Sequence, residues 1–422
     1  MIIPATPNSQ LSTVSKIIII GGGAAGFFAA ITCAQTYPHT QVTLLEAGKS
    51  PLGKVKISGG GRCNVTHACF DPLQLVQHYP RGNKALRGAF SRFQPQDTVA
   101  WYADRGVKLK TEADGRMFPT TDDSETIVSC LMDSAAAAGV KIWTGEAVAQ
   151  IAPQQPSGWT VSLKSGQFLT ADRVLLSTGN NPSAHKWAQQ LGHPISTPVP
   201  SLFTFNIPDP RLTNLAGVSV KAATVKLSTT GKNSLIQTGA LLITHWGVSG
   251  PAVLKLSAWG ARFLAESRYQ NNLIIDWLPD IHPDKLRELI LAVKSQLPQK
   301  TIHNSCPVPI PHRLWESLTC YIGIQSTDRW AGLANKTLDR LIQELNRGEY
   351  QITGKGVFKD EFVTCGGVDL KSVDFKTMES KICPGLYFAG EILDIDGVTG
   401  GFNFQSAWTT GYLAGLAMGI AT

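Results

Sequence analysis

The chain of 422 residues carries, close to its start, four isoleucines in a row followed by glycines spaced as G-x-G-x-x-G. Ile17–Ile20 predicts a buried strand, and Phe27–Gln35 has the composition of a helix that follows it. In this pattern Gly21 allows a tight turn, Gly23 lets backbone N–H groups approach a pyrophosphate, and Gly26 lets helix and strand pack closely. The segment predicts the opening of an α/β fold that binds a dinucleotide.

A carboxylate stands where such a fold needs one. A second predicted strand, Gln41–Leu45, ends in Glu46, twenty positions after Gly26. A carboxylate at this place accepts hydrogen bonds from ribose hydroxyls, and the unpaired N–H groups of the helix start around Ala25 favour a phosphate. The alternative is a βαβ unit without a ligand, and the acidic residue at this spacing favours the dinucleotide.

The composition is that of a globular protein. Hydrophobic residues make up 43% of the chain and charged residues 16%, which is not typical of disorder, and the length suggests two or three domains. The first fifteen residues lack the basic start and apolar core of a secretory signal, and no apolar run is long enough to span a bilayer. We therefore expect a cytoplasmic protein with no membrane partner.

Cysteine spacing and net charge narrow the range of partners. Eight cysteines are scattered without a C-x-x-C pair, so we expect reduced thiols and no metal site. The net charge of +7 is compatible with an anionic cofactor or substrate. Because the basic residues are spread along the chain and no nucleic-acid-binding motif is present, no nucleic-acid partner is expected.

The pattern of predicted elements divides the chain into four stretches. An α/β unit occupies residues 1–195, and the proline-rich segment Pro194–Pro200 has the composition of a linker. A β-rich insertion follows over 196–270, and a helical part over 271–350. Residues 351–422 return to strand and helix, so the nucleotide-binding domain is predicted to be split. This arrangement is typical of flavoproteins, whereas simple dehydrogenases keep their dinucleotide unit continuous.

The C-terminal block is the second strong signal. The predicted strand Leu386–Ala389 delivers a glycine and an acidic residue to a loop, and a glycine pair then opens a helix from about Phe402 to Leu416. The acid suits ribityl hydroxyls, and the helix start suits the flavin edge that gains negative charge on reduction. An ordinary strand–loop–helix is the alternative. The flavin contacts expected here are Gly390, Glu391, Asp396, Gly400, Gly401, Phe402 and Asn403.

A glycine-rich loop, Gly53–Thr66, is the third signal. Consecutive glycines expose backbone donors and let the chain pass close to a flat ligand, although a simple flexible turn has the same composition. Cys63 within it is interpreted as a small packed thiol, because no second cysteine stands nearby to resolve it. The cofactor contacts expected from this loop, and from the end of the predicted strand Arg173–Leu176, are Lys54, Ser58, Gly59, Gly60, Gly61, Arg62, Asn64, Thr66, Thr178 and Gly179.

No residue can be assigned as catalytic from the sequence. His67 and His245 stand next to glycine-rich loops and titrate near neutral pH, and Arg62 offers directional donors, so these three are candidates only. His245 lies in a turn before the predicted helix Ala252–Trp259, where the turn either binds an anion or caps the helix.

The chain resembles the BaiN-type family of bacterial FAD-containing proteins over nearly its whole length. The segments that carry the resemblance are Gly21–Gly26, Lys54–Thr66, Gly115–Pro119, Thr244–Pro251, Gly366–Val368 and Met378–Asn403. The resemblance implies an α/β fold with a split Rossmann-type FAD-binding domain. It also implies an inserted β-barrel-like domain that carries a small helical subdomain. In this family Glu46 would hold the adenosine ribose, the N-terminal glycines the pyrophosphate, and Glu391 with Asn403 the ribityl chain and flavin.

These observations predict an FAD-dependent oxidoreductase that transfers hydride at flavin N5 to or from a small organic substrate. No second G-x-G-x-x-G follows a strand, so NAD(P)H is expected only as a transient electron donor. Two alternatives stay open: a flavin-dependent protein that modifies tRNA, and a non-catalytic FAD-binding sensor. Substrate identity and oligomeric state are not predicted.

Overall fold

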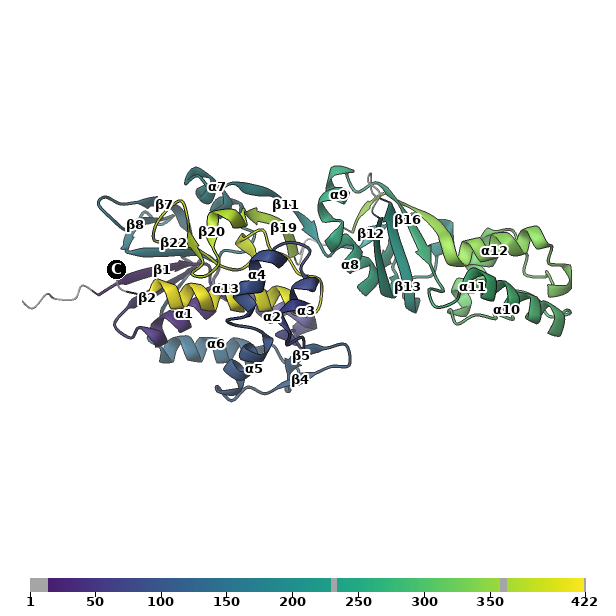
Figure 1. Ribbon diagram of the computed structural model, residues 1–422, viewed down its shortest axis with the longest axis horizontal. Coiled ribbons are helices and arrows are strands. Elements are labelled where there is room, and N and C mark those ends of the chain that lie inside the picture. The colour runs from purple at the N-terminus through teal and green to yellow at the C-terminus, as the bar shows by residue number, and fades with distance from the viewer. Residues whose placement is uncertain (1–13, 229–233, 357–362, 421–422) are drawn as a thin grey trace, which may run out of the picture. The chain divides into compact units, whose positions relative to one another are not determined.

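A computed structural model of the protein describes residues 14–228, 234–356 and 363–420 (Figure 1). The chain divides into two compact units. The first unit joins the N-terminal part, up to Thr197, with Gly366–Ile395 and Gly400–Thr422. The second unit comprises Pro198–Cys365 with the short segment Asp396–Thr399. None of the helices in the described part of the chain is long and apolar enough to cross a membrane.

The first unit is built on a seven-stranded sheet with the order β20-β21-β22-β10-β1-β2-β6. The five strands from β22 to β6 run parallel, and the two at the other edge are antiparallel. Strand β1, the middle one of the five parallel strands, carries the four isoleucines, all buried, as expected for a strand covered on both faces. The strands are β1 Lys16–Ile20, β2 Gln41–Glu46, β6 Lys141–Thr144, β10 Arg173–Leu176, β20 Val373–Asp374, β21 Glu379–Ser380 and β22 Leu386–Phe388.

The two ends of the chain contribute to this one sheet. Strand β22, from the C-terminal part, pairs in parallel with β10, with Val174 opposite Leu386 and Leu176 opposite Phe388. On its other side β10 pairs with β1. A strand that follows the long insertion therefore completes the same sheet that the first residues begin.

Helix α1, Ala24–Thr36, and the last helix α13, Phe402–Met418, pack tightly against each other (Figure 1). A Cβ atom added at Gly411 would lie 2.5 Å from the carbonyl oxygen of Ala25, and one at Gly415 would lie 2.6 Å from that of Ala29. These glycines are four residues apart, so they share one face of α13. Only a residue without a side chain permits this approach of the two backbones.

Shorter elements surround the central sheet of the first unit. Two three-stranded sheets, in the orders β3-β5-β4 and β7-β8-β9, are both antiparallel. Their strands are β3 Thr66–His67, β4 Leu109–Thr111, β5 Arg116–Pro119, β7 Val148–Pro153, β8 Trp159–Leu163 and β9 Phe168–Ala171. The helices are α2 Gly53–Gly61, α3 Pro72–Leu75, the 3-10 helix η1 Val76–His78, α4 Asn83–Phe90, α5 Pro95–Ala103, α6 Glu125–Ala137, α7 Pro182–Gln190, η4 Leu370–Ser372 and η5 Gly390–Ile392.

The second unit contains an antiparallel seven-stranded sheet with the order β17-β16-β13-β14-β15-β12-β18. Strands β17 and β18 stand at opposite ends of this order, yet only Thr353 separates them in the chain. The sheet must therefore roll round until its two outer strands lie near each other. The strands are β12 Phe205–Asn206, β13 Ser219–Ser228, β14 Ser234–Ile243, β15 Gly247–Ser249, β16 Asn271–Asp276, β17 Gly348–Ile352 and β18 Gly354–Lys355.

Helices pack against this sheet around one apolar core. A buried ion cluster connects one of these helices to a strand of the sheet. Arg211, 4% exposed, donates to Asp209 at 2.7 Å and to Glu344 at 2.8 Å, and its guanidinium lies 3.7 Å from the centre of the Tyr350 ring. Glu344 belongs to a helix and Tyr350 to a strand, so the cluster ties the two layers together. The helices are α8 Pro251–Trp259, α9 Ala261–Glu266, α10 Pro283–Gln296, α11 His312–Tyr321, α12 Asn335–Arg347, and the 3-10 helices η2 Pro210–Leu212 and η3 Trp330–Gly332.

One local prediction was incomplete and one was wrong. The boundary between the two units follows Thr197, inside the predicted linker Pro194–Pro200, but the segment is not irregular, because strand β11, Ile195–Ser201, occupies most of it and pairs with β19, Val363–Val368. Pro198 and Pro200 alternate, so both missing N–H groups fall on one edge and the other edge stays free to pair. The loop expected over Gly53–Thr66 begins as helix α2, and left-handed glycines interrupt the helix after Ile57.

Replacing Gly411 or Gly415 by valine should destabilise the fold, because either side chain would push α13 away from α1. We expect each substitution to lower the free energy of unfolding by about 1–3 kcal/mol, measured by urea denaturation followed by circular dichroism. Gly88→Ala is the matched control, since an added Cβ there meets no described atom within 4 Å and the position lies inside helix α4. Unchanged stability of both valine variants would contradict this account of the helix pair.

Candidate cofactor site

The N-terminal glycines differ in what surrounds them. An added Cβ at Gly21, where φ is +110°, would lie 2.5 Å from the carbonyl oxygen of Ser177, and one at Gly26 would collide with the carbonyl oxygen of Gly21. At Gly23 the same atom would meet nothing within 4 Å among the described residues. Two of the glycines are thus required for backbone packing, and the middle one faces the open space that a diphosphate needs.

The start of helix α1 and the end of strand β10 both present unused polar groups to this region. Gly23 caps the helix without a side-chain hydrogen bond, so the N–H groups of the first turn, which includes Ala25, lack a side-chain acceptor there. Thr178 follows β10, and its buried Oγ1 has no hydrogen-bond partner in the part of the chain that the structure describes. A helix N-terminus beside an orphaned hydroxyl suits a phosphate-bearing ligand.

Glu46 is held in a fixed orientation at the end of β2. Its Oε2 accepts from the backbone N–H of Gly22 at 2.8 Å, and its Oε1 accepts from that of Gly48 at 2.7 Å. Each carboxylate oxygen can accept a further hydrogen bond. The side chain is therefore oriented in advance to accept from vicinal hydroxyls such as those of a ribose.

Segments far apart in the sequence meet around Glu391, in η5. Its Oε2 lies 2.6 Å from Lys54 Nζ, and an added Cβ at Gly179 would come within 3.5 Å of the same oxygen. Next to it, Cβ atoms added at Gly390 would approach the Cβ of Ala25 to 2.9 Å. The structure thus brings the helix start of the N-terminal motif, the α2 segment and the C-terminal block together.

The glycine-rich loop forms a defined turn. Gly59, Gly60 and Gly61 all have positive φ, at 59°, 71° and 83°. The Oγ of Ser58 donates to the carbonyl of Val55 at 2.9 Å. Added Cβ atoms at Gly60 and Gly61 would meet no described atom within 4 Å, so this backbone leaves room for a neighbouring group.

Asn64 links this loop to the start of helix α13. Its side-chain oxygen accepts from the N–H of Gly401 at 2.9 Å, and its side-chain nitrogen donates to the carbonyl of Thr66 at 3.1 Å. The hydroxyl of Thr66 donates to the buried Oε1 of Gln405 at 2.6 Å. Gly400 and Gly401 have φ of 135° and 91°, so the backbone before the helix is one that glycine favours.

Aromatic rings gather at the first residue of α13. The Phe402 ring stacks with His67 at a centroid distance of 4.7 Å and with His78 at 4.2 Å, and its carbonyl accepts from the Tyr79 hydroxyl at 2.6 Å. His67 Nε2 also lies 3.1 Å from the carbonyl oxygen of Asp114. Asn403 occupies the first turn of the same helix. His67, alone among the three catalytic candidates, is packed against the C-terminal block.

Other predicted site residues have different surroundings. Arg62 pairs with Glu112 at 2.7 Å and stacks over the Phe118 ring at 4.0 Å, so its head is engaged in an ion network. Asp396 is fully buried and belongs to the second unit, where its Oδ2 accepts from the hydroxyl of Ser201 at 2.7 Å. His245 is exposed in the second unit.

The sequence analysis missed two features of this region. Gln405 is fully buried, and its amide joins the hydroxyls of Thr66, Thr98 and Thr409 in one network. The available signal was a glutamine four residues before a threonine in the predicted C-terminal helix. His78 was missed because nothing local marks it, and only the fold places it beside Phe402.

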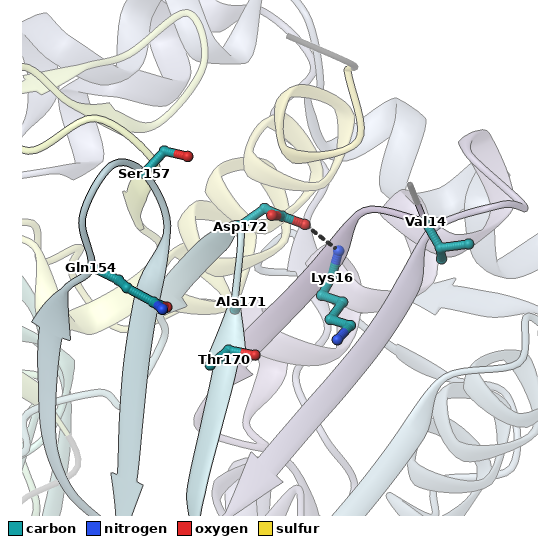
Figure 2. Close-up of a pocket in the computed structure, with 7 residues that line it drawn as sticks. All are labelled: Val14, Lys16, Gln154, Ser157, Thr170, Ala171 and Asp172. Atoms are coloured by element: carbon teal, nitrogen blue, oxygen red, sulfur yellow. Dashed lines mark hydrogen bonds between the residues drawn. The ribbon is translucent and has the colours of Figure 1, made fainter. Parts of the chain in front are cut away.

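A surface hollow of about 450 Å³ lies at the amino ends of strands β1 and β10, whereas the N-terminal glycines follow the carboxyl end of β1 (Figure 2). It lies where strand β1 begins, next to the β7–β8 turn and the end of β9, and the backbone N–H of Lys16 donates there to Asp172 at 2.7 Å. Ligands of open α/β sheets bind outside the carboxyl ends of the strands. The region around Gly23 and Glu391, and not this hollow, is therefore the candidate site.

Comparison with known proteins identifies the family. The sequence profile of the family described as HI0933-like protein Rossmann domain matches residues 15–417. The chain belongs to this family. The match confirms the resemblance seen in the sequence, and the HI0933-like chain is thus an FAD-dependent oxidoreductase with a Rossmann-type FAD-binding fold and an additional antiparallel sheet domain.

Two relatives cover nearly the whole HI0933-like chain. The 3-dehydro-bile acid delta(4,6)-reductase of Clostridium scindens is 30% identical over 413 residues, which are 96% of this chain and 99% of the relative. The ribosomal RNA dihydrouridine synthase of Haemophilus influenzae is 30% identical over 420 residues, which are 97% of this chain and 99% of the relative. Both are named as enzymes, in agreement with the expectation from the sequence.

A solved structure supports the fold. The 3-ketosteroid delta1-dehydrogenase from Sterolibacterium denitrificans superimposes with a TM-score of 0.50 at 13% identity. The superposition covers 96% of this chain and all of the other. At this identity the similarity concerns the fold alone.

Cys63 should be chemically inert although it stands in the glycine-rich loop. Burial raises the pKa of its thiol to about 12, against a weaker opposing effect of a hydrogen bond with Ser58, so almost no thiolate forms near neutral pH. We expect iodoacetamide at pH 8 to alkylate the exposed Cys320 in the folded protein and to leave Cys63 unmodified, as measured by peptide mass spectrometry. Comparable labelling of the two residues would contradict the buried placement.

Proposed function

We propose that this protein is an FAD-dependent reductase that adds two hydrogens across a carbon–carbon double bond conjugated to a carbonyl group. The names of the two relatives support this reaction class. A delta(4,6)-reductase acts on double bonds of a 3-dehydro steroid acid, and a dihydrouridine synthase forms a pyrimidine that is saturated at one such bond. The two substrates differ in size and charge, but in each the reduced bond is conjugated to a carbonyl.

The adenine half of FAD is proposed to lie along the N-terminal motif. Gly21 and Gly26 keep the backbone close-packed, Gly23 leaves room for the diphosphate, and Glu46 is oriented toward ribose hydroxyls. The orphaned hydroxyl of Thr178 supplies one further polar contact. This set fits a dinucleotide because the open position, the free helix start and the fixed carboxylate follow one another along the carboxyl edge of the sheet.

The flavin half is proposed to lie along the C-terminal block. When bound, the flavin accepts or donates a hydride at N5. The start of helix α13 would direct N–H dipoles at the ring edge that becomes negative on reduction, and the Lys54–Glu391 ion pair fixes the acid that would meet the ribityl chain. The other proposed cofactor contacts are Ala25, Ser58, Gly59, Gly60, Gly61, Asn64, Thr66, Gly179, Gly390, Gly400, Gly401, Phe402 and Asn403.

The proton that accompanies the hydride is proposed to come from His67. Its ring stacks on Phe402, at the start of the helix that would face the flavin, and the carbonyl of Asp114 at 3.1 Å orients Nε2. NAD(P)H is proposed as a transient electron donor. The rolled sheet of the second unit, with its helical layer, is proposed to be the barrel-like insertion.

Loss of the two adenine-side contacts should abolish cofactor retention without unfolding the protein. We expect wild-type protein to purify yellow, and the double variant Gly23→Val with Glu46→Ala to be colourless, because the valine fills the diphosphate space and the ribose loses its acceptor. Absorbance at the flavin band and circular dichroism measure the two effects. Gly332→Val is the control, since it adds a side chain in similarly open space in the second unit. A folded double variant with stoichiometric FAD would refute the site assignment.

The reaction class can be tested with two probes under anaerobic conditions. We expect NADH or NADPH to bleach the bound flavin, and either a steroid 4-en-3-one or a uridine-containing RNA transcript to restore its colour. The matching saturated steroid ketone and a transcript containing dihydrouridine in place of uridine should leave the flavin reduced, because they lack the conjugated bond. Equal reoxidation by saturated and unsaturated probes, or by none of them, would contradict the proposed reaction.

A further inference from the structure

We propose that the surface formed by α3, η1 and α4 binds the phosphate backbone of RNA, so that the reducible base is presented as part of a polynucleotide. The proposal rests on the proposed function and specifies its substrate class. The surface, named here the α3–α4 surface, consists of Leu73, Gln74, Val76, Gln77, Asn83, Lys84 and Arg87, which line a hollow of about 410 Å³.

The charged side chains of the segment that forms this surface are all positive. Residues 72–96 contain four Lys or Arg side chains and no Asp or Glu, although charged residues of both signs occur in the rest of the chain. Lys84 and Arg87 are three residues apart on one face of α4, both are exposed, and neither forms an ion pair within the described part of the chain. The carboxylate of Asp71, just before the segment, accepts from the N–H of Leu73 at 2.9 Å. The surface therefore presents uncompensated positive charge, which attracts phosphates.

The other polar groups of the surface are amides. Gln74, Gln77 and Asn83 stand around the two cations, and all three side chains are exposed. Amides donate to phosphate oxygens and both donate to and accept from ribose 2′-hydroxyls, so cations among amides suit a sugar–phosphate backbone. A single carboxylate of a steroid acid would engage one cation and leave the rest of this surface unused.

The chain that forms the α3–α4 surface also contacts the start of helix α13, which is the flavin end of the proposed site. Gln77 contributes to the surface, and the next residue, His78, stacks on Phe402 at 4.2 Å. Tyr79 follows and donates to the Phe402 carbonyl at 2.6 Å. A backbone bound to this surface would therefore have its nearby bases beside the start of helix α13, where the flavin is proposed to lie.

The test compares RNA binding by the FAD-loaded wild type and by the double variant Lys84→Gln with Arg87→Gln. The probe is a fluorescein-labelled RNA hairpin with a uridine-rich loop, titrated by fluorescence anisotropy at several KCl concentrations. We expect the dissociation constant of the double variant to rise about tenfold, and the slope of log K against log[salt] to fall by about 1.5, because two phosphate contacts are lost.

The control variant, Lys141→Gln with Lys164→Gln, removes the same charge from exposed sites on the first unit, and it should bind the hairpin like the wild type. Equal weakening in both double variants, or no measurable binding by the wild type at low salt, would overturn the proposal. So would binding of sodium cholate that depends on Lys84 and Arg87 while hairpin binding does not.

The failure of this inference can be separated from failure of the proposed function. Flavin content and anaerobic reoxidation by the steroid enone are measured on the same preparations. If flavin is retained and the enone restores its colour while RNA binding does not depend on the α3–α4 surface, only the inference is wrong. If flavin is not retained by the wild type, the proposed function is wrong whatever the hairpin shows.

Discussion

The contact between helices α1 and α13 is the constraint on which the rest of the first unit depends. Gly411 and Gly415 bring the two backbones so close that the carbonyls of Ala25 and Ala29 touch the partner helix. Helix α1 starts at Gly23, in the N-terminal glycine motif, and helix α13 starts after Gly400 and Gly401. The packing of the two helices therefore sets the position of one helix start relative to the other. An extended dinucleotide needs both ends fixed in this way, since its two halves are recognised by segments far apart in sequence.

Much of the first unit could be predicted from the sequence because its signals are local. The four isoleucines, the glycine spacing and the acidic residue that ends β2 depend on a few neighbouring positions, and β10 has the predicted bounds. Strand β11 was missed because proline composition indicates a linker unless the pairing partner is known, and that partner comes from residues far along the chain. The glycine pair of α13 was missed because its meaning lies in the helix opposite.

The candidate site shows the same division. Residue type and sequence spacing identified Glu46, Glu391 and the glycine-rich loop as candidate cofactor contacts. Which of these positions lie close together in space depends on the tertiary structure. No local pattern places Lys54 2.6 Å from Glu391 or His78 against Phe402. The positive charge of residues 72–96 was visible in the sequence, yet it gained significance only when the fold placed Lys84 and Arg87 beside exposed amides. Motifs thus indicate which chemistry is present, and packing decides where it operates.

The split sheet also has a consequence for synthesis on the ribosome. Strand β10 emerges early with one edge paired to β1, but its other neighbour, β22, is made only after Pro198–Cys365, the main part of the second unit. Until then the nascent chain carries an open sheet edge and an α1 surface without α13, both of which favour association with other chains. The second unit can complete its core before the first unit is finished. The N-terminal part of the first unit, which is synthesised first but completed last, would therefore be the part that chiefly needs chaperone protection during translation.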